Sequence, residues 1–99
     1  MKNLCFILLI AASAYGGSPA TARLYKDHFA CSREVWLRDT YEYADKRDQT
    51  SMISYLAMRR CFRTLDAIVY LLALKNDAAQ ILVGGRTMWV DSDAIEMTN

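Results

Sequence analysis

Residues 68–83 of this chain, IVYLLALKNDAAQILV, decide its fold class. The two apolar runs are typical of β-strands, and Lys75-Asn76-Asp77 between them favours a turn. Gly84-Gly85 provides a second tight turn before residues 87–90, TMWV, whose side chains alternate between two faces. The segment therefore predicts three antiparallel strands. A helix over residues 65–74 is the alternative that its Ala and Leu content would favour.

The pattern before Cys61 is helical. Apolar side chains recur at helical spacing over about 33–46, where Ser32 is a suitable N-cap. Asp48 or Thr50 can cap a second helix that ends near Arg60.

The resulting prediction is an α+β fold in which two N-terminal helices, within residues 32–60, pack on a small antiparallel β-sheet within residues 66–97.

The first 22 residues read as a secretory signal peptide. One positive charge at Lys2 precedes a short apolar core, and Ala20-Thr21-Ala22 forms an A-x-A cleavage site. An earlier site, Ala12-Ser13-Ala14, would leave almost no room after the apolar core. The alternative of an uncleaved membrane anchor would need about 20 apolar residues. We therefore expect a single small mature domain, residues 23–99, that is periplasmic or secreted.

Two cysteines remain after that cleavage, because Cys5 lies inside the apolar core of the leader. In an exported protein the even count predicts one disulfide between Cys31 and Cys61, which would contribute about 3 to 4 kcal/mol by the chain-entropy argument. A redox-active pair or a zinc site are the alternatives. The first typically has C-x-x-C spacing, and the second needs two further ligands.

The charges exclude a general attraction to polyanions. Without Lys2 the chain holds 11 basic and 11 acidic residues, so no net field draws it to nucleic acid or to an anionic membrane. The charges are unevenly placed. An acidic stretch runs through residues 39–48, and Arg59, Arg60 and Arg63 cluster around Cys61. These stretches are either solvated faces or a binding patch.

The end of the chain resembles bacterial SH3-like domains over about residues 61–97. Residues 86–95, RTMWVDSDAI, are similar to a G-x-x-G-W-V segment followed by a 3₁₀ turn and a final apolar residue, with Met88 in place of the second glycine. The layout is also similar to small exported bacterial proteins with a cysteine before a helical segment and another ahead of such a sheet. The resemblance implies that Cys31 is bonded to Cys61 and that the helices pack on an SH3-like sheet.

Catalytic patterns are sparse. The one histidine, His28, is interpreted as a surface residue, and no G-x-S-x-G, H-E-x-x-H, P-loop or G-x-G-x-x-G occurs. Asp91, Asp93 and Glu96 offer carboxylates for Ca²⁺ but lack the glycine and distal glutamate of a calcium loop. We expect no catalytic residue, no metal and no cofactor.

The predicted function is that of an exported, non-enzymatic binding protein without a membrane span after cleavage. Its partner would be another protein or a cell-envelope component. Trp89 with Tyr70 could line an aromatic groove, although core packing is the alternative for Trp89. The candidate binding surface comprises Trp89, Tyr70, Arg59, Arg60 and Arg63. The alternative function is a small hydrolase or metal-dependent enzyme that uses His28 or Asp91 and Asp93.

Overall fold

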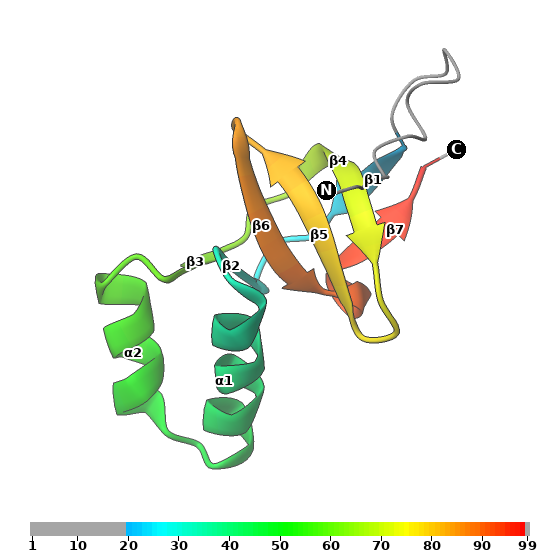
Figure 1. The fold of residues 1–99 in the computed structure, drawn as a ribbon. Coiled ribbons are helices and arrows are strands. Elements are labelled where there is room, and N and C mark those ends of the chain that lie inside the picture. The colour runs from blue at the N-terminus through cyan, green and yellow to red at the C-terminus, as the bar shows by residue number, and fades with distance from the viewer. Residues whose placement is uncertain (1–19, 99) are drawn as a thin grey trace, which may run out of the picture.

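The computed structural model describes residues 20–98, so that most of the predicted signal peptide, residues 1–19, lies outside the described part. Two helices and seven strands form within this range (Figure 1). In chain order the elements are β1 Thr21–Leu24, β2 Phe29–Cys31, α1 Glu34–Asp45, α2 Gln49–Ala57, β3 Cys61–Arg63, β4 Ala67–Leu74, β5 Ala78–Val83, β6 Arg86–Asp91, the 3₁₀ turn η2 Ser92–Ala94 and β7 Ile95–Met97.

The predicted arrangement of these elements is wrong, although the fold is α+β. The helices are not N-terminal, because β1 and β2 precede them. The sheet is also larger than expected, with seven antiparallel strands in the order β3-β2-β6-β5-β4-β1-β7. The strands that the sequence did not reveal have three or four residues each, which is too short for an alternating pattern to stand out.

The central strands follow the prediction. β4, β5 and β6 pair as consecutive hairpins, and residues 67–74 form a strand rather than the alternative helix. The β5–β6 turn consists of Gly84 and Gly85, both with positive φ (59° and 78°). Two such residues in succession match the right-handed twist of the flanking strands, which is why the tight hairpin requires glycine there.

The sheet curls around an apolar core on its inner face. Residues from β1, β2, β4, β5, β6 and η2 meet there, although their strands are distant in the sheet order. Many of the buried side chains are small. The buried members are Ala22, Leu24, Ala30, Val69, Ala79, Ile81, Met88, Val90 and Ala94.

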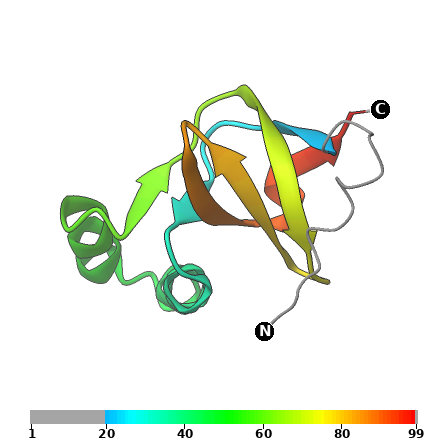
Figure 2. The same cartoon turned by 45° about the horizontal axis from the view of Figure 1, so that its top comes forward.

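The helices cover only part of the outer face. Figures 1 and 2 show α1 and α2 together at the β2–β3 end of the sheet, with β1 and β7 at the opposite end. Leu37 of α1 and Tyr55 of α2 form a second buried cluster with Cys31, Cys61 and Ala78. No helix within residues 20–98 is long and apolar enough to span a membrane.

The predicted disulfide between Cys31 and Cys61 is present. The two residues lie directly opposite each other on β2 and β3, and both side chains are buried. The bond therefore closes the base of the excursion that contains both helices. Closing a loop across a sequence separation of 30 residues contributes about 3.5 kcal/mol by the chain-entropy argument.

The helix caps agree with the prediction at one helix and not at the other. Asp48 caps α2, because its carboxylate accepts a hydrogen bond from the Ser51 N–H. Ser32 does not cap α1, whose N-cap is Arg33 without a side-chain cap.

A network of ion pairs joins α1 to the β4–β5 turn. The Arg38 guanidinium donates to Glu34 on the same helix (2.8 Å) and to Asp77 in the turn (2.7 Å). The Lys75 ammonium also donates to Glu34 (2.7 Å). Lys75 and then Arg38 lower the pKa of Glu34, and Arg38 lowers the pKa of Asp77. The network links the first turns of α1 to the sheet.

This network predicts acid-sensitive stability. A carboxylate whose pKa is lowered in the folded state stabilises the fold above its unfolded pKa, and this stabilisation is lost as the pH falls through the folded value. The ordinary values are 4.5 for Glu34 and 3.8 for Asp77. The urea midpoint should therefore fall as the pH drops from about 6 to about 3. Arg38→Met should reduce the size of that fall, since it removes the main hydrogen bond that lowers the pKa of Asp77 and the second of the two that lower the pKa of Glu34.

Lys46→Met is the matched control. Lys46 pairs with Glu42 four residues earlier on α1 (2.9 Å) and connects no other element. Its variant should keep the pH dependence of the parent, whereas a fall of the same size in the Arg38 variant and the parent would contradict the account.

Candidate functional site

Three large apolar side chains of β4 face water on the outer side of the sheet. They alternate with Val69 and Leu71, which pack on the inner core, because successive side chains of a strand point to opposite faces. We call the three residues the β4 strip: Ile68 (65% exposed), Tyr70 (46%) and Leu72 (47%). Such a row is unusual on a folded surface and marks a candidate contact area. A β-bulge between Leu71 and Ala73 shifts the register, so that Leu74 lies opposite Ala79 of the inner core and is not part of the strip.

Polar groups border the β4 strip on one side. The register places Thr21 of β1 opposite Tyr70, and Arg23 opposite Ile68. Arg23 in turn lies opposite Glu96 of β7. Because directly opposite residues share a face, the apolar strip has a polar rim along β1 and β7.

Half-buried Leu82 extends the apolar surface on the other side. This residue of β5 lies opposite both Tyr70 of β4 and Thr87 of β6. The contact area therefore continues from the β4 strip toward β6.

Trp89 shares the outer face with Tyr70 but does not form a groove with it. Trp89 lies on β6, two strands from Tyr70, and is partly buried against the cluster beneath α1. The Lys75 ammonium covers its ring at 5.1 Å from the centroid. The ring of Trp89 thus packs with the helices, while Tyr70 remains exposed.

The three arginines predicted as part of one surface have separate local contacts. The guanidinium of Arg60 lies over the rings of Trp36 and Tyr55, at 5.2 Å from each centroid. Arg63 lies over the ring of Phe29 at 5.3 Å. Such contacts fix the guanidinium planes against the helical end of the molecule.

Arg59 ends α2 in a left-handed conformation with φ of 60°. The next residues lead into β3, which lies four positions from β4 in the sheet order. The structure therefore separates the arginines from Tyr70.

The residues of the enzymatic alternative do come together. His28, Asp91 and Asp93 line a cavity of about 220 Å³ between β2, α1 and the end of β6. The Asp91 carboxylate caps η2, where it accepts a hydrogen bond from the Asp93 N–H (2.8 Å). Within residues 20–98 no group of three or more His, Cys, Asp or Glu side chains is placed to hold a metal ion.

The hydroxyl groups of this cavity are poor nucleophiles. Thr40 Oγ1 donates to the Leu37 carbonyl (2.6 Å), so its proton is engaged. Burial and the neighbouring Asp91 carboxylate raise the pKa of Tyr41. A nucleophile needs its proton removed by an adjacent base. Here the Thr40 proton is held by the Leu37 carbonyl, and the Tyr41 hydroxyl donates to the Asp77 carbonyl (3.3 Å).

The sequence contains one signal for the β4 strip. Residues 67–74 are apolar at nearly every position, so both faces of the strand are apolar. Two helices of 12 and 9 residues cannot cover a seven-stranded sheet, so part of that second apolar face remains exposed.

Comparison with protein-family models, with curated proteins and with solved structures found no match for this chain. The resemblance to exported bacterial proteins with an SH3-like sheet accordingly stays a prediction.

Proposed function

We propose that this chain is an exported, non-enzymatic binding protein that holds a partner protein on the β4 strip. The observation that carries the proposal is the row of three exposed apolar side chains on β4. β4 pairs with β5 on one edge and, over residues 67–70, with β1 on the other, so the backbone beside Ile68 and Tyr70 is engaged. A partner would therefore contact side chains rather than extend the sheet.

The surroundings of the β4 strip favour a protein over a lipid surface. The apolar row lies beside Thr21 and Arg23, and Glu96 lies one strand further out. An apolar centre with a polar rim is the usual anatomy of a protein interface. Insertion into a membrane would bury these polar groups without partners, at a cost that the apolar row would have to offset.

The absence of an activated nucleophile around His28 supports a binding role. The hydroxyls that line the 220 Å³ cavity are hydrogen-bonded to backbone carbonyls, and Asp91 serves as a cap. These groups hold the local structure together, which leaves the β4 strip as the better candidate for function.

The disulfide supports export. A buried Cys31–Cys61 bond fits an oxidising compartment, such as the periplasm or the cell exterior.

Strand β1 indicates where the leader would be removed. Thr21 and Ala22 belong to β1, and the Ala22 side chain is fully buried in the inner core. Cleavage after Ala22 would remove two of the four residues of this strand, so we place the cut before Ala20.

Intact mass spectrometry of the exported protein tests this placement. We expect a mature chain that begins at Ala20 or upstream of it, with the mass of one disulfide rather than two thiols. A chain that begins at Arg23 would contradict the role of β1. A full-length chain with free thiols in the cytoplasm would contradict export altogether.

Site-specific photo-crosslinking tests the β4 strip. A photoreactive amino acid at Leu72 should crosslink to a partner protein in the exporting cell. The same group at Ile53 should not, although Ile53 is 63% exposed on α2. The crosslink at Leu72 should be lost when Ile68→Lys is added, because a charge on the same row disfavours burial of the strip.

Ile53→Lys is the matched control and should leave the crosslink at Leu72 intact. Circular dichroism would show that both variants fold. Equal crosslinking at the two positions, a product with the mass of two copies of this chain, or no protein product would each contradict the proposal.

A further inference from the structure

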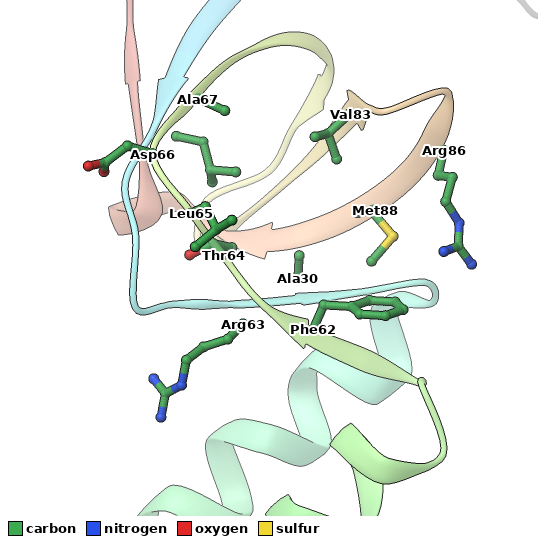
Figure 3. A pocket seen from close by; sticks show the side chains of 11 residues that line it. Ala30, Phe62, Arg63, Thr64, Leu65, Asp66, Ala67, Val83, Arg86 and Met88 are labelled. Carbon is green, nitrogen blue, oxygen red and sulfur yellow. The ribbon is translucent and has the colours of Figure 1, made fainter.

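A second, separate cavity of about 370 Å³ opens on the inner face of the sheet. Figure 3 shows Phe62, Val83, Met88 and Arg86 around it, on strands β3, β5 and β6. Leu24, Ala30 and Met88 lie deepest, with 3 to 5% exposed. This volume lies within the range of small-molecule sites, about 300 to 1,000 Å³.

The cavity exists because small residues occupy inner positions. Ala30 of β2 lies opposite Phe62 of β3, and Ala67, the first residue of β4, also lines the cavity. The edge strands β3 and β7 do not pair with each other, so the curled sheet is not closed by hydrogen bonds. Alanine side chains do not fill the space between the strands, which leaves an apolar hollow rather than a packed core.

Two of the polar groups at the cavity already have partners. Thr64 Oγ1 donates to the Tyr25 carbonyl (2.7 Å) and accepts from the His28 N–H (2.9 Å). The Asp66 carboxylate accepts from the Lys26 N–H (3.0 Å) and points away from the hollow in Figure 3.

The two arginines at the cavity differ in direction. Arg63 also points away, toward the ring of Phe29. Arg86 stands at the rim with its guanidinium 5.4 Å from the centroid of Phe62, and within residues 20–98 it forms no ion pair. The hollow therefore combines carbon-lined walls with one available cation.

We infer that this cavity binds an anionic amphiphile of the fatty-acid type, with its hydrocarbon chain among Phe62, Val83 and Met88 and its carboxylate on Arg86. A guanidinium binds a carboxylate through two parallel hydrogen bonds. Leu65, which is 77% exposed at the cavity, offers further apolar surface that a hydrocarbon chain would cover. This site is distinct from the β4 strip, which lies on the opposite face of the sheet.

Decanoate is the probe, titrated below its micellar concentration into the full disulfide-bonded protein. Methyl NMR spectra should show saturable shifts at Met88 and Ala30. Decyltrimethylammonium has a chain of the same length and the opposite charge, and should bind at least about ten-fold more weakly. Arg86→Gln should reduce that preference to about two-fold or less. Val83→Trp should abolish binding of both probes by filling the cavity.

The Arg86 variant keeps the experiment decisive if Val83→Trp fails to fold, because Arg86 is exposed at a turn. Each of these two variants, if it folds, should retain the Leu72 crosslink. A failure of the amphiphile proposal can therefore be distinguished from a failure of the proposed partner site on the β4 strip. Non-saturable shifts, equal affinity for the two probes, or stronger binding of a short peptide that ends in phenylalanine would overturn the inference.

Discussion

The bond between Cys31 and Cys61 is the constraint on which the relation of helices and sheet depends. The chain leaves the sheet at the end of β2 and returns at the start of β3, and the disulfide joins these two points. Both helices lie between them. Leu37 and Tyr55 pack on the same buried cluster as the two sulfurs, so the covalent link and the apolar contact reinforce each other. For a domain this small, a staple of about 3.5 kcal/mol is comparable to the whole expected stability.

The position of this staple determines which surfaces remain open. Because the helices are tied to β2 and β3, they cover the outer face beside β6 and leave β4 bare. The same sheet curls over its inner face, where alanines leave a hollow at one side of the core. One face thus offers an extended apolar row suited to a protein surface. The other offers an open apolar hollow with a cation at its rim, suited to a small amphiphile.

Some of this structure could be predicted from sequence and some could not. The β4–β5–β6 hairpins follow from long apolar runs separated by Lys75-Asn76-Asp77 and by Gly84-Gly85, which are local features. The disulfide follows from cysteine count and compartment. The short strands β1, β2, β3 and β7 arise from pairing with distant residues, which no local pattern reveals. The predicted leader, residues 1–22, also includes the first two residues of β1. Tyr70 is exposed and Trp89 is partly buried because of where the helices dock. Local sequence carries no information on that docking, so the sequence analysis predicted a single surface for both residues.

The most direct test of this account is native-state hydrogen exchange of the oxidised protein and of the same protein after reduction and alkylation of both cysteines. If the disulfide ties the helices to the sheet, protection should fall most in α1, α2 and β3 and least in β5, whose strand is paired on both sides. An equal loss in every element, or unchanged protection in α1 and α2, would contradict the claim that this bond organises the fold.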